Sequence, residues 1–476
     1  MTGRLTTEDA SFYFLEGSST PMHLGSLAIL RAPEGGLDYE ELLTHVERRL
    51  PLVPRYRQRV REVAFGLARP VWVDDRDFDI TYHVRRSALP KPGSDEQLHD
   101  LVARLTSRPL DRSRPLWEMY LVEGLADDRI AIFTKSHSAL VDGMTALEIG
   151  QVIFDECADP REVAEELWMP GREPRQAELV AGALAEMITR PAEGVATIRT
   201  LVGDLVGTAT SVAGNVAALL RTAATAAPST PLNATISRNR RFATAKTSLE
   251  DYRAIRARFG CSVNDVTLSV LTGALRTWLL SRGEPVTAFS TVRAMVPIAV
   301  YLPSDGPRDG GPEVGVAVRD DLPGVERRAS SLLIDLPVGE PNPVVRLSHI
   351  AHATEAHTRQ NRTVTAQALV RVSGTAPATL HAMGLRMASG LSQRMFNVMI
   401  TNAPGPQATL CLGGVQLLET YPVSPLIRNQ ALSIGLTSYD GHVYYGLNGD
   451  RDAMSDIEVL TASVHEALDE LVEACR

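Results

Sequence analysis

The sequence predicts a mixed α/β protein, and two patterns carry that prediction. Short apolar runs typical of strands alternate with stretches of helical periodicity along much of the 476-residue chain. These elements lack the short, regular spacing of strand–helix–strand units, so one doubly wound parallel sheet is not expected. A chain of this length can form two or three domains, each with a sizeable core.

The first third of the chain contains the most regular alternation. Apolar runs indicate strands, and apolar residues spaced three and four apart indicate helices. We expect, in order, a strand at 23–30, a helix at 39–50, a strand at 70–73, a helix at 96–105, strands at 117–122 and 130–136, and a helix at 145–154.

Residues 173–231 differ in composition, being rich in Ala, Val and Thr with few charges. Their longest uncharged stretch, 205–220, is too short and too interrupted by glycine to span a membrane. Two interpretations stay open: a long crossover helix packed on the body or linking two domains, or an amphipathic element that touches a membrane or lipid droplet. We therefore expect an N-terminal domain at 1–172, an Ala-rich helical linker at 173–235 and a C-terminal domain at 236–476.

Regular elements resume near Arg241. Ser262 or Asn264 can cap a long helix whose apolar residues recur at helical spacing. We expect that helix at 263–280, a strand at 289–300, a Gly/Pro-rich loop at 304–324, a strand at 331–336, a helix at 343–359, strands at 396–401, 431–439 and 443–447, and a final helix at 457–475.

Charge and cysteine usage restrict the class of protein. The net charge of -9 and pI near 5.7 argue against a nucleic-acid partner. Four cysteines lie far apart without a Cys-x-x-Cys pair, so neither a zinc site nor a disulfide framework is expected, and reduced thiols fit a cytoplasmic protein. The N-terminus does not resemble a signal peptide. No metal-ligand cluster or Gly-rich phosphate loop is present in the sequence, so no metal is expected.

The clearest chemical pattern is KSHSALVDG at residues 135–143. His137 follows an apolar run and precedes Asp142 and Gly143. A histidine at a strand end can take a proton from an alcohol, and Asp-Gly makes a turn with little side-chain bulk. This pattern indicates a site for transfer chemistry.

Six further strings surround this segment in order along the chain. They are PMHLG at 21–25, WVDD with FD and HV at 72–84, PLDRSRPLWE at 109–118, ND at 264–265, TNAPGP at 401–406 and YPVSP at 421–425. Together with 135–143, which is similar to an HHxxxDG signature, they resemble the bacterial wax ester synthase/diacylglycerol acyltransferase (WS/DGAT) family over nearly the whole chain.

This resemblance implies a two-domain CoA-dependent acyltransferase fold related to chloramphenicol acetyltransferase. Each half would be a mixed sheet flanked by helices, with a tunnel between the halves. It implies a long-chain acyl-CoA as co-substrate, no other cofactor, and diacylglycerol or a long-chain alcohol as acceptor, giving triacylglycerol or wax ester. It also implies direct attack of the acceptor hydroxyl on the thioester, with the second histidine of the signature as base.

Two departures from the family pattern concern that chemistry. Ser138 occupies the position of the second histidine, and a hydroxyl has no acid–base capacity near neutral pH. The family's PVSxR string corresponds to PIAVY at 297–301, so Tyr301 replaces an arginine. Ser138 would then leave space or bind water where imidazole stands in the family. A shifted His137 as base and a structural His137 that faces away from the tunnel both remain open.

The other site residues also carry two interpretations. Asp142 is expected to anchor the loop, and Gly143 to leave room for substrate. Asn264, Asp265 and Asn402 are expected at the substrate, although a helix cap and a turn also account for them. The sequence thus favours an O-acyltransferase with weak turnover, located in the cytoplasm and in peripheral contact with membrane or lipid droplets. A non-catalytic acyl-CoA or lipid-binding protein and an acyltransferase for a specialised metabolite are the alternatives.

Overall fold

Two large β-sheets organise the chain, whose computed structural model describes residues 3–33, 37–140, 149–161, 163, 167–189, 227–303, 325–359 and 395–476. In spatial order, the first sheet contains β4 (Val84–Ala88), β5 (Trp117–Leu125), β6 (Arg129–His137), β1 (His23–Arg31), β13 (Val415–Val423), β12 (Leu410–Leu412) and β7 (Asp155–Glu156). Only the β4–β5 pair is parallel among these paired strands. The expectation of a sheet without regular parallel units is therefore confirmed.

The second sheet is built from the C-terminal half of the chain. Its order is β10 (Val325–Leu336), β9 (Val292–Pro303), β11 (Val398–Pro404), β14 (Leu432–Tyr439), β15 (His442–Asp450) and β8 (Arg240–Ser248). Here β11 pairs in parallel with both β9 and β14. A separate small ribbon joins β2 (Gln58–Arg61) and β3 (Val71–Asp74).

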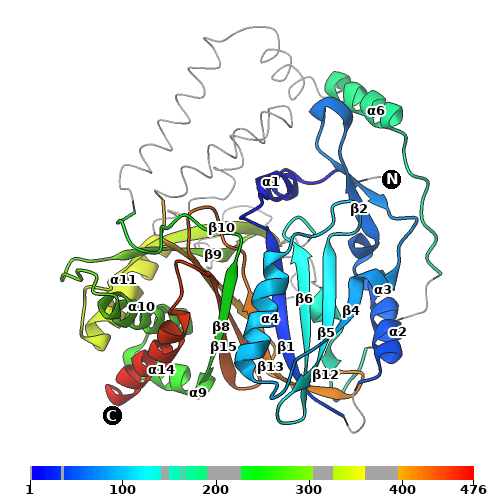
Figure 1. Cartoon of the computed structure of the whole chain (residues 1–476). Coiled ribbons are helices and arrows are strands. Elements are labelled where there is room, and N and C mark those ends of the chain that lie inside the picture. Colours follow the sequence, from blue (N-terminus) through cyan, green and yellow to red (C-terminus); the bar gives the residue numbers. More distant parts are fainter. Residues whose placement is uncertain are drawn as a thin grey trace, which may run out of the picture.

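Helices cover both sheets, and the first sheet's helices lie in the right half of Figure 1. Their bounds are α1 (Thr7–Leu15), α2 (Tyr39–Arg49), α3 (Ile80–His83), α4 (Asp95–Ser107), α5 (Ile149–Val152), α6 (Gln176–Thr189), α9 (Leu249–Phe259), α10 (Val263–Ser281), α11 (Pro343–Arg359) and α14 (Ile457–Glu473), with short 3-10 turns at Leu50–Leu52, Pro54–Arg57 and Ala64–Gly66. Helix α4 also lies against β8 of the second sheet, where His99 contacts Thr244 at 3.1 Å.

Helix α10 is the centre of the C-terminal half. It is buried on most of its circumference, including Trp278, because it packs against α9, α11 and α14. Its start is fixed by a capping box, in which the Ser262 hydroxyl accepts from the Asp265 N–H and the Asp265 carboxylate accepts from the Ser262 N–H. The cap is therefore Ser262, not Asn264.

Strand β13 joins the two halves because it lies in the first sheet although it comes from the C-terminal part of the chain (Figure 1). Near its C-terminal end, Pro422 passes so close to the second sheet that a Cβ on Gly446 would overlap the Pro422 carbonyl oxygen. A Cβ on Gly435 would lie 2.8 Å from the Pro422 Cβ. Glycine is therefore required where β14 and β15 meet this segment.

Most elements expected from the pattern are confirmed with shifted ends. The expected helix at 145–154 is described only from 149, and it ends at Val152. The loop at 304–324 and linker residues 190–226 lie outside the described residues, whereas α6 occupies the start of the expected linker. The domain bounds at 172 and 236 stay a prediction, and β12 and β13 show that the first sheet draws on both expected domains.

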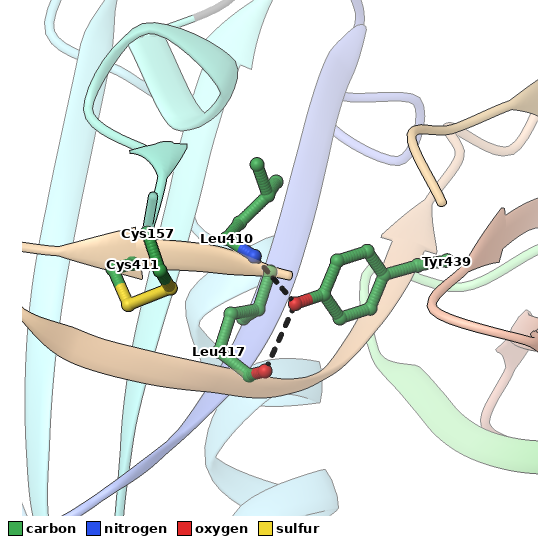
Figure 2. Close-up of a disulfide and its surroundings, with 5 residues drawn as sticks. All are labelled: Cys157, Leu410, Cys411, Leu417 and Tyr439. Atoms are coloured by element: carbon green, nitrogen blue, oxygen red, sulfur yellow. Dashed lines mark hydrogen bonds between the residues drawn. A yellow bond between two sulfur atoms is a disulfide. The ribbon is translucent and has the colours of Figure 1, made fainter. Parts of the chain in front are cut away.

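The expectation that the cysteines form no disulfide is wrong. Cys157 and Cys411 are bonded, with Cα atoms 5.0 Å apart and a sequence separation of 254 (Figure 2). The antiparallel pairing of β7 with β12 brings together two cysteines whose sequence spacing carries no signal of it. Cys261 and Cys475 are free thiols.

Within the described ranges, none of the helices has both the length and the apolar character needed to cross a lipid bilayer.

The close approach of Pro422 gives a stability prediction. Gly446→Ala is expected to lower the free energy of unfolding by roughly 1–3 kcal/mol, because the backbone of one half must move away from the other. The control is Gly182→Ala on the exposed face of α6, where an added methyl meets no atom within 4 Å. Urea unfolding of both variants measures the difference, and equal stabilities would contradict the role of this contact.

Candidate functional site

The predicted site residues His137 and Ser138 stand where β6 ends beside the start of β1. His137 lies opposite His23 in the antiparallel register, and its N–H donates to the Leu116 carbonyl at 2.9 Å. The Ser138 N–H donates to the Met22 carbonyl at 2.8 Å. Backbone hydrogen bonds thus fix this strand end from both sides.

The His137 imidazole is turned into the protein and is only 1% exposed. Its Nδ1 accepts a hydrogen bond from the Ala139 N–H at 2.9 Å, so the proton of the neutral ring resides on Nε2. The Nε2 atom lies 3.8 Å from a carboxylate oxygen of Glu16. Both ring nitrogens therefore face protein groups.

We use the term Glu16 cluster for Tyr13, Glu16, His23, Arg112 and His137. Glu16 lies 3.0 Å from His23 Nε2 and 2.8 Å from the Arg112 guanidinium, which itself stacks over the Tyr13 ring. Arg112 is the half-exposed member, whereas His23 and His137 are buried. A buried carboxylate is thus compensated by one permanent cation and two imidazoles.

Burial determines the protonation of this cluster. Burial lowers the pKa of His137 to about 3, although the charge of Glu16 acts in the opposite direction. Burial alone would raise the pKa of Glu16, but its hydrogen bond with His23, the charges of both histidines and Arg112 hold that pKa at about 2. At neutral pH, His137 is therefore a neutral and very weak base.

Ser138 is buried beside this cluster. Its hydroxyl donates to the Met22 carbonyl at 2.9 Å, so its single proton is already used in a hydrogen bond. Asp142 and Gly143, the other two residues of the motif, lie outside the described residues.

The predicted site residues of the C-terminal half meet at the start of α10. The Asn402 amide donates to the Asn264 side-chain oxygen at 3.4 Å, which brings the TNAPGP and ND strings together. Asp265 points into its helix cap, and it also accepts from the Thr354 hydroxyl at 2.7 Å. Asn264 and Asn402 remain partly accessible.

Sequence reasoning missed the charged partners of the motif. Lys135 is buried, and its ammonium lies 3.1 Å from Glu118 and donates to the Leu105 and Arg108 carbonyls at the end of α4. Glu16 was also missed, since it follows α1 and has no motif spacing to His137. The sequence feature that could have indicated Glu16 is its negative charge, which is complementary to that of Arg112 in the PLDR string. Over the described residues, His, Cys, Asp and Glu form no group of three or more that could hold a metal.

Comparison with known proteins decides the family. Residues 5–267 match the wax ester synthase/diacylglycerol acyltransferase catalytic domain, and residues 328–472 match the WS/DGAT C-terminal domain. The chain belongs to the WS/DGAT family. The family predicted from the seven strings is thereby confirmed.

Relatives within the WS/DGAT family include two from Mycobacterium tuberculosis. One, named probable diacylglycerol O-acyltransferase tgs3, is 57% identical over 265 residues, which are 55% of this chain and 98% of that protein. Another, named probable diacylglycerol O-acyltransferase tgs1, is 32% identical over 98% of this chain and 95% of its own length.

Solved structures agree with the WS/DGAT assignment. The wax ester synthase/diacylglycerol acyltransferase from Marinobacter aquaeolei VT8 is similar with a TM-score of 0.69 and 27% identity, covering 99% of both chains. The first condensation domain of the CDA synthetase, at 14% identity and a TM-score of 0.54 over 100% of this chain and 97% of its own, shares the fold alone. The expected two-domain acyltransferase fold is confirmed.

The depressed pKa of His137 gives a pH prediction. Between pH 6.5, the ordinary pKa of histidine, and about pH 3, this histidine is protonated in the unfolded chain but neutral in the folded chain. Stability is therefore lost as the pH falls through this window, by up to roughly 5 kcal/mol from this group. His137→Gln is expected to flatten the pH dependence of urea unfolding between pH 6.5 and 4.

The matched control for this measurement is His352→Gln, on the exposed face of α11. This variant is expected to keep the wild-type slope. The burial argument would be contradicted if both histidine variants gave the same pH dependence as the wild type.

Proposed function

We propose that this chain is a CoA-dependent O-acyltransferase that uses a long-chain acyl-CoA and acylates diacylglycerol or a long-chain alcohol. Family membership and the names of the M. tuberculosis relatives support the reaction class. The tunnel that family resemblance implies between the two halves belongs to this proposal. Its apolar walls would contribute roughly 0.8 kcal/mol of binding per buried methylene of the acyl chain.

The proposed reaction is a direct transfer. The acceptor hydroxyl oxygen bonds to the thioester carbonyl carbon, the carbon–sulfur bond breaks, and CoA leaves as a thiol carrying the hydroxyl proton. In the family pattern a histidine at position 138 moves that proton. Ser138 has no basic atom, and its hydroxyl is committed to Met22.

Family membership carries the proposed reaction class, and the orientation of His137 is the observation that carries the proposal of slow transfer. Its Nδ1 is occupied by the Ala139 N–H, and its Nε2 faces Glu16. A pKa near 3 also lies far from the operating pH of a useful general base. These contacts favour His137 as a residue that positions the strand end, and they favour slow transfer without a resident base at position 138.

We further propose Asn264 and Asn402 as substrate contacts. Their amides meet at 3.4 Å, and they are only partly buried, so both retain hydrogen-bonding capacity for a ligand. Asp265 would act indirectly, by fixing the start of α10 that carries Asn264. Asp142 and Gly143 keep their proposed roles as loop anchor and space for the substrate.

A cytoplasmic location with peripheral contact to membrane or lipid droplets is part of the same proposal. Diacylglycerol and long-chain alcohols partition into lipid rather than water, so the acceptor must be taken from a lipid surface. Leu167 and Met169, in the segment before α6, are 90% and 78% exposed and supply apolar side chains for such contact.

Restoring the base tests this function. Ser138→His is expected to raise CoA release from palmitoyl-CoA, with diacylglycerol or hexadecanol as acceptor, by roughly 100-fold or more. Ser138→Gln, which adds bulk without a basic nitrogen, is the matched control and is expected to stay near the wild-type rate. His137→Gln is expected to alter the stability of the folded chain but to leave the rate of CoA release near that of the wild type.

Two other outcomes of this experiment would contradict part or all of the proposed function. Fast wild-type turnover that disappears in folded His137→Gln would identify His137 as the base and contradict its positioning role. If no variant releases CoA while acyl-CoA raises the melting temperature, the non-catalytic binding protein is favoured, because acyl-CoA then binds the folded chain without reacting.

A further inference from the structure

The Cys157–Cys411 disulfide joins segments that the reaction proposed above does not use. Cys157 follows β7, and Cys411 is the central residue of β12 (Figure 2). The Cys157 residue is exposed, whereas Cys411 is half-buried. A reagent from solvent therefore reaches the sulfur of Cys157 first.

Few non-covalent contacts hold β7 to β12. The strand β7 has two residues, paired as Leu410 with Glu156 and Cys411 with Asp155. One more backbone hydrogen bond, from Cys157 N–H to the Thr409 carbonyl at 3.0 Å, continues this pairing. The disulfide is thus the strongest connection between the two segments.

On one side of the disulfide, the chain leads back to the motif. Helix α5 and β7 are the first described elements after the motif, and Asp155 of β7 is held by ion pairs with Arg49 of α2 and with Arg161. These ion pairs are independent of the sulfur atoms, so the β7 side keeps its own anchorage.

On the other side, the hairpin of β12 and β13 is tied to the second sheet by Tyr439 of β14. Its hydroxyl accepts from the Leu410 N–H at 2.9 Å and donates to the Leu417 carbonyl at 3.0 Å (Figure 2). A continuous path therefore runs from the segment after the motif, through the disulfide and β12, to the C-terminal sheet.

We propose that the Cys157–Cys411 bond is a site of thiol–disulfide exchange with a dithiol reductant, and that its redox state controls how firmly the segment after the motif is held to the C-terminal half. Reducing compartments keep few permanent disulfides, and an exposed one is open to exchange. This inference goes beyond the proposed acyl transfer; it rests on the proposed location in a reducing compartment and not on the transfer reaction.

The exchange proceeds in two steps. A thiolate of the reductant attacks Cys157 Sγ, the Cys157–Cys411 bond breaks, and Cys411 leaves as a thiolate that takes up a proton. The second thiol of the reductant then attacks the mixed disulfide on Cys157, which leaves as a thiolate and is protonated. The protein gains two electrons and two protons, and the dithiol becomes a disulfide.

The direct test uses the folded wild-type chain. Glutathione in limited amount traps the mixed disulfide, and peptide mass spectrometry locates it; the adduct is expected on Cys157. After reduction by dithiothreitol without denaturant, residues 149–161 and 409–417 are expected to exchange amide hydrogens roughly 10-fold faster, with β5 and β6 unchanged. An adduct on Cys411, a bond that breaks only on unfolding, or unchanged exchange would each overturn the proposal.

A variant gives a second readout. Cys157→Ser is expected to melt about 5 °C below the oxidised wild type, because a closure of 254 residues is lost. Dithiothreitol is expected to lower the wild-type melting temperature equally and to leave Cys157→Ser unchanged. Cys475→Ser, which removes a free thiol, is the control. Equal wild-type melting temperatures with and without dithiothreitol would contradict the proposal even if Cys157→Ser failed to fold, and no step requires CoA release.

Discussion

The passage of β13 between the two halves is the constraint on which the rest of the structure depends. This strand completes the first sheet between β1 and β12, and its end presses Pro422 against Gly435 and Gly446 of the second sheet. The Asn448 amide donates to the Ser424 carbonyl at 2.7 Å just beyond it. Because backbones meet here without intervening side chains, the two sheets have little freedom to separate, and the motif in one half keeps a fixed relation to the other.

Desolvation is the second constraint, and it decides what the motif histidine can do. The strand end carries His137 into a buried cluster whose only permanent cation is Arg112. Burying a neutral imidazole there costs less than burying an imidazolium, which would lose its hydration with one carboxylate as partner. The hydroxyl of the neighbouring Ser138 donates its proton to the Met22 carbonyl, and it has no basic atom that could accept the proton of the acceptor. The strand geometry and the missing second histidine therefore both support the proposal that the fold is kept and the transfer is slow.

Local periodicity predicted most strands and helices, and seven motif strings predicted the family. Both kinds of pattern involve residues that are close together in the sequence. Long-range features were not accessible in this way. Strand β13, which overlaps the start of the YPVSP string, was not predicted, since no short-range pattern indicates pairing with β1. The Cys157–Cys411 bond and the Glu16–His137 contact join residues far apart in the chain, so only the folded sheet brings them together. Asn264 and Asn402, predicted from separate strings, do meet.

The protonation of His137 is the most direct test of this account. Nitrogen-15 NMR of histidine-labelled protein, with His137→Gln to assign the signal, distinguishes the tautomers and follows titration. We expect one neutral form with the proton on Nε2, unchanged from pH 8 to about pH 5 and unaffected by acyl-CoA. Titration between pH 6 and 7, or a change of tautomer when acyl-CoA binds, would contradict the account and return His137 to the role of base.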